Sequence, residues 1–154
     1  MKKFRLLFSI PLFLLLLGGC TSSENSASKT TENCPTCNMK IPSSKQYTST
    51  LYVKQNRHNF DDIGCMILFS KENQINLKDM KSEVFTVDTQ TFINSQKAYY
   101  KTDAQTPMNY GFSAYENEQN ASISFDKVIV KMLRGEHMAN PKIRKLILGT
   151  KNEQ

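Results

Sequence analysis

The sequence predicts an α+β fold made of one compact domain and a C-terminal helix. Three observations support this class. Apolar and polar residues alternate over several short segments, which is typical of half-buried strands. Longer segments have apolar residues at helical spacing and follow a residue that can cap a helix, which indicates helices. The order strand, strand, helix, strand occurs twice, so we expect two small related units that form a single domain over residues 34–154.

The first predicted unit contains two strands, a helix and a third strand. Apolar and polar side chains alternate over residues 46–54, which predicts a strand, and a tight turn is expected to lead into a second strand at residues 58–60. Asp61 or Asp62 then caps a helix with an apolar side. Residues 83–88, EVFTVD, are rich in β-branched and aromatic side chains and complete the unit as a strand.

The second predicted unit repeats this order. Residues 98–101 and 110–115 have the pattern of strands, and a short helical stretch is expected near residues 117–125. The β-branched run KVIV at residues 127–130 predicts a closing strand.

A C-terminal helix is predicted after Asn140, which suits the capping position. Pro141 suits the first helical position and Gly149 suits the stop. Apolar residues recur at helical spacing between them, so we expect this helix to pack on the sheet.

The first nineteen residues have the features of a bacterial export signal. A basic start is followed by an apolar run, Leu6 to Leu17, that is too short for a comfortable membrane span. The end of this segment and the next residue, Cys20, resemble a lipobox, in which the cysteine is acylated and begins the mature chain. We therefore predict a signal peptide over residues 1–19 and a lipidated cysteine with a flexible linker over residues 20–33. The domain would then lie on the extracytoplasmic face of the bacterial cell membrane; a plain secretory signal is the alternative.

The charge balance does not favour nucleic-acid binding. Three of the 20 Lys and Arg residues lie in the predicted signal, which leaves 17 basic against 14 acidic residues. A surplus of +3 is too small for the basic surface that nucleic-acid binding requires, so no nucleic-acid partner is expected.

Three thiols remain after lipidation of Cys20, and an odd number cannot all pair within one chain. A structural Cys34–Cys37 disulfide with a buried Cys65 is one explanation. A thioredoxin-like pair is another, but no hydrophobic strand precedes the motif and Pro42 opposes a helix directly after it. A zinc ribbon would need a second Cys or His pair of similar spacing, which Cys65 does not have.

The methionines favour a soft metal ion. Met39 follows the Cys-x-x-Cys pair closely, and Met108 lies in a proline-containing loop between two predicted strands. Copper(I) prefers thiolate and thioether sulfur to oxygen, so we predict copper(I) as the bound metal. Cys65 begins a predicted helix, whose field favours a thiolate. Asp61 and Asp62 are expected to act as helix caps rather than as ligands.

Five segments, in this order, resemble the NosL family of copper-binding lipoproteins. They are the lipobox at Cys20, CPTCNMKI (34–41), FDDIGCM (60–66), VDTQTFINSQKAYY (87–100) and TPMNYGFSAY (106–115). The resemblance implies two related ββαβ units in one domain and the binding of one copper(I) ion. It also implies delivery of that ion, outside the cytoplasm, to a cuproenzyme of the nitrous oxide reductase type or to its maturation machinery.

The resemblance also assigns candidate copper ligands by position, which are Cys37, Met108, Cys34 and Met39. Cys65, at the start of the predicted helix, is a further candidate. The family usually has glycine where this chain has Asn38 and Asn109. Asparagine adopts positive φ more readily than most residues, so we expect the same turns here.

The sequence therefore predicts a copper chaperone without enzymatic activity, because no general base, nucleophile and orienting residue come together in it. The alternative is a thiol-disulfide or copper-reductase lipoprotein that works through Cys34 and Cys37.

Overall fold

The computed structural model describes residues 32–151 and confirms an α+β fold with a C-terminal helix. The predicted signal peptide, the lipidation site Cys20 and most of the linker lie outside the described residues. None of the helices between residues 32 and 151 combines the length and the hydrophobicity that a membrane span requires. The elements are β1 (Ser49–Val53), β2 (Asn56–Phe60), α1 (Ile63–Glu72), β3 (Ser82–Phe85), β4 (Phe92–Asn94), the 3-10 helix η1 (Ser95–Lys97), β5 (Tyr99–Thr102), β6 (Phe112–Tyr115), α2 (Phe125–Leu133) and α3 (Pro141–Lys151).

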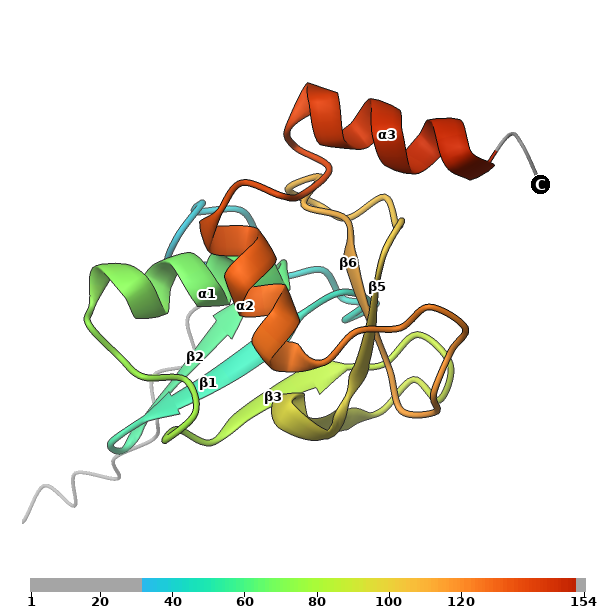
Figure 1. The fold of residues 1–154 in the computed structure, drawn as a ribbon. Coiled ribbons are helices and arrows are strands. Elements are labelled where there is room, and N and C mark those ends of the chain that lie inside the picture. The colour runs from blue at the N-terminus through green and yellow to red at the C-terminus, as the bar shows by residue number, and fades with distance from the viewer. Residues whose placement is uncertain (1–31, 152–154) are drawn as a thin grey trace, which may run out of the picture.

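The larger sheet has four antiparallel strands in the order β2-β1-β3-β4. Leu51 of β1 pairs with His58 of β2, and Val84 of β3 pairs with Ile93 of β4. The helix α1 lies over β1 and β2 (Figure 1), and the buried Leu51, Val84 and Met66 are part of the core of the fold. The first predicted unit is thus present as β1, β2, α1 and β3. The three-residue strand β4 was not predicted.

The second unit has the predicted strands but a different ending. The strands β5 and β6 form a two-stranded antiparallel sheet, and a parallel bridge between Thr86 and Ala114 joins it to the end of β3. Residues 127–130 lie inside α2, so the predicted closing strand is wrong, and so is the helical stretch expected at 117–125. The unit therefore has the order strand, strand, helix, with α2 packed against α1 and β5 (Figure 1).

The ends and the buried face of α2 explain why this segment is helical. Phe125, Val128 and Met132 are buried and recur at helical spacing. Gly135 has φ +72°, and its N–H donates to the Met132 carbonyl while the Glu136 N–H donates to Lys131. This pair of bonds is a Schellman motif, which closes the helix with glycine in the left-handed region.

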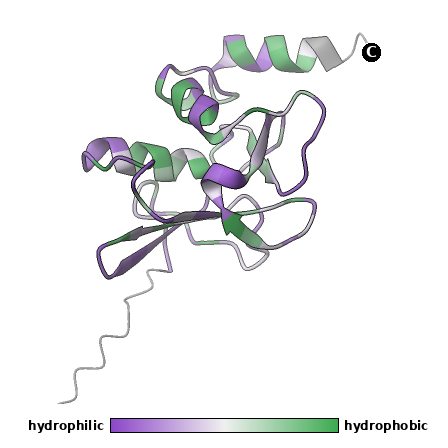
Figure 2. Ribbon diagram, turned by 60° about the horizontal axis from the view of Figure 1, so that its bottom comes forward, coloured by the Kyte–Doolittle hydropathy of each residue, from purple (hydrophilic) through white to green (hydrophobic). Residues whose placement is uncertain are grey.

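The helix α3 starts as predicted but packs differently. The Asn140 side chain accepts the Lys142 N–H at 3.1 Å, which caps the first turn. Both views place α3 on the far side of α1 and α2 from the four-stranded sheet (Figures 1 and 2). Leu146 is 65% exposed and Leu148 is 41% exposed, so the expectation that this helix packs on the sheet is wrong.

Candidate metal centre

Four potential ligand side chains converge between the N-terminal turn and the start of α1. The sulfur atoms of Cys34, Cys37 and Cys65 and a carboxylate oxygen of Asp61 all lie within 4.8 Å of one another. All three cysteines are free, so the described chain contains no Cys34–Cys37 disulfide. The sequence predicted each of these cysteines as a candidate, and the fold brings all three together with an aspartate that was assigned only a capping role.

The turn around the first two cysteines directs backbone N–H groups toward sulfur. The Cys34 N–H donates to the Met39 carbonyl at 2.8 Å, and the Asn38 N–H donates to the Cys34 carbonyl at 2.9 Å. The N–H of Cys37 also donates to the Cys34 sulfur, and the N–H of Met39 donates to the Cys37 sulfur. Asn38 has φ +61°, which confirms the positive φ predicted there. Each of these N–H groups lowers the pKa of the thiol to which it donates, although for Cys37 the effect of burial is larger.

The start of α1 supplies the other two groups. Asp62 is the N-cap, with extended backbone and a side chain that accepts the Gly64 N–H at 2.9 Å. The capping role therefore belongs to Asp62, and Asp61, which directly follows β2, is available to the cluster. Cys65 follows in the first turn of α1, fully buried. The Thr36 hydroxyl donates to the Cys65 carbonyl at 2.9 Å and ties the turn to the helix.

Asp61 is the member of this group that sequence reasoning did not predict as a ligand. It is 1% exposed, its Oδ1 accepts the Cys37 thiol at 3.1 Å, and its Oδ2 is buried without a hydrogen-bond partner among the described residues. Buried carboxylate oxygens are normally paired, so an unpaired one beside three sulfurs indicates a place for a cation. The signal in the sequence was the spacing of Asp61 and Cys65 by four residues across a helix start.

The three thiols have different proton affinities. The Cys65 thiol donates to the Cys34 sulfur, which is the main reason that the pKa of Cys34 is lowered to about 6. The same shared proton, with burial, raises the pKa of Cys65. Burial raises the pKa of Cys37 to about 12, and the Asp61 carboxylate adds to this. At neutral pH these shifts leave one thiolate in the cluster, at Cys34, and two thiols, at Cys37 and Cys65.

The loop that carries Met108 is fixed to the same helix start. The Oδ2 of Asp62 accepts the Thr106 hydroxyl at 2.5 Å and the Met108 N–H at 3.3 Å. Asn109 has φ +55°, as predicted for this turn. The Met108 side chain is partly buried against the core, whereas Met39, on the first turn, is 38% exposed.

The aromatic ring of Tyr110 holds this loop against α1. A Cβ placed on Gly64 would lie 2.2 Å from the ring, so only glycine leaves room for it. Burial, followed by the charges of Cys65 and Asp62, raises the pKa of Tyr110 to about 12. The ring of His137 meets that of Tyr110 edge-on, with centroids 4.9 Å apart. Residues distant in sequence thus cover the helix start beside the cysteines.

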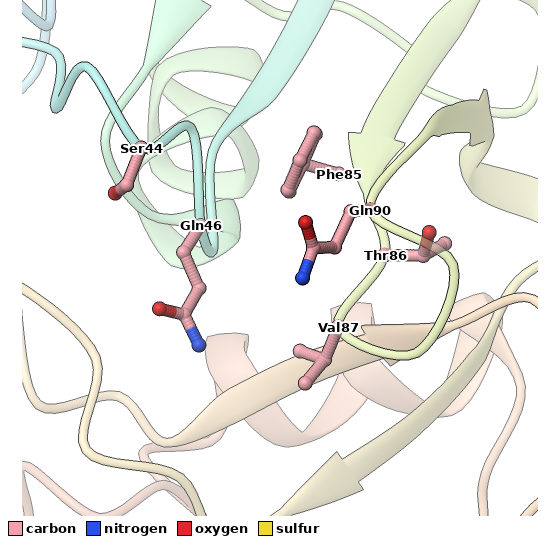
Figure 3. A pocket seen from close by; sticks show the side chains of 6 residues that line it. All are labelled: Ser44, Gln46, Phe85, Thr86, Val87 and Gln90. Carbon is pink, nitrogen blue, oxygen red and sulfur yellow. The ribbon is translucent and has the colours of Figure 1, made fainter.

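A surface pocket of about 190 Å³ lies elsewhere on the fold. Figure 3 shows its lining residues, which are Ser44, Gln46, Phe85, Thr86, Val87 and Gln90. It contains no carboxylate, imidazole or thiol, so the pocket adds no acid, base or metal ligand to the candidate site.

Comparisons with protein-family models, with curated proteins and with solved structures found no match to this chain. The chemistry of the cysteine cluster is therefore the basis of the functional argument.

Proposed function

We propose that this chain binds copper(I) at the three-cysteine cluster and passes it to a protein partner outside the cytoplasm, while Cys20 anchors it to the membrane through lipid. The observation that carries the proposal is the convergence of Cys34, Cys37 and Cys65, with their sulfurs within 4.8 Å of one another. The resemblance of five sequence segments to the NosL family supports the same function. It also suggests the partner, which is a cuproenzyme of the nitrous oxide reductase type or its maturation machinery.

The cluster suits copper(I) as cargo. This ion is soft, prefers thiolate and thioether ligands, and forms stable sites with few of them. Cys34 already exists as a thiolate at neutral pH, since its pKa is about 6. Copper binding then displaces a proton from a second thiol. Met108, held beside the helix start, is the proposed thioether ligand, and Met39 is a further one on the exposed side.

Release is proposed to proceed at Cys37. Its side chain is partly exposed, whereas Cys34 and Cys65 are buried, so an incoming thiolate of the partner reaches the metal from this side. As the Cu–Cys37 bond breaks, the partner's Cu–S bond forms, and the released Cys37 thiolate takes up a proton from solvent because its pKa is raised to about 12. Asp61 Oδ1 accepts the resulting thiol hydrogen bond, which is the contact that it makes with Cys37 in the structure. No electron is transferred.

A copper(I) titration tests this proposal. Residues 21–154, reduced and anaerobic, compete for copper(I) with a chelator of known affinity, and we expect a one-to-one complex. Removing a thiolate with Cys37→Ser should weaken binding roughly 100-fold, and removing a thioether with Met108→Leu roughly 10-fold. Met80, which also packs against the core but outside the site, supplies the matched control Met80→Leu. Affinity that neither Cys37→Ser nor Met108→Leu changes would rule out this site.

Thiol-disulfide exchange is the alternative, and two features weigh against it. An exchange reaction needs an accessible thiolate. Here the thiolate is on Cys34, which is 2% exposed, while the more exposed Cys37 is a thiol with a pKa of about 12.

Alkylation rates distinguish a metal site from an exchange site. We expect iodoacetamide at pH 8 to modify the native, reduced, metal-free protein at least tenfold more slowly than the same protein in urea, because unfolding exposes Cys34 and returns Cys37 to an ordinary pKa. Mass spectrometry of the quenched protein gives the rate at each cysteine. Rapid modification of one native cysteine would instead favour the exchange reaction.

A further inference from the structure

We infer that the cluster has a second occupied state, in which a thiophilic divalent cation of the zinc(II) class is bound by Cys34, Cys37, Cys65 and Asp61. This inference rests on the proposed function, because both place a metal ion at these cysteines. It deepens that function by naming the class of ion that competes with copper(I) for the site.

The geometry fits a four-coordinate ion. Two chain segments supply the donors in the pattern Cys-x-x-Cys and Asp-x-x-x-Cys, and the donor atoms lie within 4.8 Å of one another. In a tetrahedral zinc-type site with metal–sulfur bonds of about 2.3 Å, neighbouring sulfurs are separated by about 3.8 Å. Side-chain adjustments of about 1 Å therefore close the site, while the N–H donors to Cys34 and Cys37 keep the turn in place.

Asp61 decides which class of ion this state takes. Its Oδ2 is buried, and among residues 32–151 this atom has neither a hydrogen-bond partner nor an ion pair. Copper(I) takes sulfur and leaves a carboxylate uncoordinated, whereas zinc(II) takes carboxylate oxygen together with thiolate. A divalent ion thus gives the unpaired Oδ2 atom of Asp61 a partner, which copper(I) does not.

The charge of the fully deprotonated cluster supports the same class. Three thiolates and one carboxylate carry four negative charges in a buried region, where uncompensated charge is strongly unfavourable. A divalent ion neutralises two of them and a copper(I) ion only one. Cys34 and Cys65 are buried, which gives the closed character of a site that retains its ion.

Cobalt(II) is the spectroscopic probe for this state. Reduced, metal-free residues 21–154 should bind one cobalt(II) with sulfur-to-cobalt charge-transfer bands and the intense visible bands of tetrahedral coordination, and zinc(II) should bleach both. Asp61→Asn should weaken cobalt(II) binding roughly 100-fold, and its effect on copper(I) binding should be at least tenfold smaller than that. Asp61→Cys should retain a tetrahedral spectrum with stronger charge transfer, because a fourth thiolate replaces the oxygen.

The controls keep folding and metal binding apart. Asp126→Asn removes an exposed aspartate that pairs with Lys78 and does not belong to the cysteine cluster, so it should leave the binding of both metals unchanged. Circular dichroism of each metal-free variant shows whether it is folded. A weak, octahedral-type cobalt(II) spectrum in the wild type, or unchanged cobalt(II) affinity in folded Asp61→Asn, would overturn the inference. Tight copper(I) binding without a tetrahedral cobalt(II) complex would overturn the zinc-type state but leave the proposed copper function standing. Tetrahedral cobalt(II) binding without copper(I) binding would support the zinc-type state and overturn the proposed copper function.

Discussion

Replacing Asp62 with alanine is expected to lower the free energy of unfolding by about 3 kcal/mol. Asp62 is fully buried, and its two oxygens accept three donors, from Gly64, Thr106 and Met108. Alanine removes the N-cap of α1 and leaves those donors without an acceptor inside the fold. Urea titration of the metal-free, reduced protein, followed by circular dichroism, measures the loss.

The solution pH and two variants make this measurement specific. Burial raises the pKa of Asp62 to about 6, so this side chain is ionised in the wild-type protein at pH 7.5. The urea titrations of the wild type and the variants are therefore carried out at that pH. Asp62→Asn keeps an oxygen for the Gly64 N–H and should lose less than the alanine variant. Asp79→Ala removes an exposed aspartate and should stay within about 0.5 kcal/mol of wild type. A loss of less than 1 kcal/mol in Asp62→Ala would show that solvent or neighbouring groups replace this carboxylate.

The part of the fold that could be predicted from sequence is the part with strong local signals. Alternation over residues 46–54 and the aspartates before α1 located β1, β2 and α1, because strand period and helix capping are both local. Asn38 and Asn109 were expected at positive φ, and both have it, since the conformation depends mainly on the residue and its turn.

The prediction failed where tertiary contacts override local preference. The run Val128-Ile129-Val130 has strand-like composition, but Val128 lies between the buried Phe125 and Met132 on one helical face. The glycine that ends α2, Gly135, was the local signal for a helix. The position of α3 had no local signal, because its apolar residues predict a buried face but not which surface would cover it.

The candidate site was also only partly predictable. The Cys-x-x-Cys motif is local and was found directly, whereas the approach of Cys65 to Cys34 depends on how β2 leads into α1. Asp61 was misassigned because adjacent aspartates before a helix offer two equivalent caps, and only the backbone conformation selects Asp62. An acidic residue next to a helix cap and four residues before a cysteine is the pattern that would have indicated a mixed sulfur and oxygen site.

Replacing Gly64 with alanine is expected to lower the free energy of unfolding by about 2 kcal/mol and to weaken copper(I) binding to the extent seen for Met108→Leu. The new Cβ would lie 2.2 Å from the Tyr110 ring, and an aromatic ring packed in a loop cannot yield by a simple rotamer change. The loop must then move away from α1, which takes the Met108 backbone away from Asp62. Urea titration and chelator competition measure the two effects on the same protein.

Gly149→Ala is the matched control, because nothing lies within 4 Å of a Cβ added there. In the helix α3 this change should leave copper(I) affinity unchanged and raise stability by at most about 1 kcal/mol. A double-mutant cycle with Tyr110→Ala then tests the cause, since without the ring the Gly64→Ala change should lose most of its effect on stability. If Gly64→Ala is as stable as wild type and binds copper(I) equally well, the contact between Tyr110 and α1 does not position the Met108 loop, and the thioether must be sought at Met39 instead.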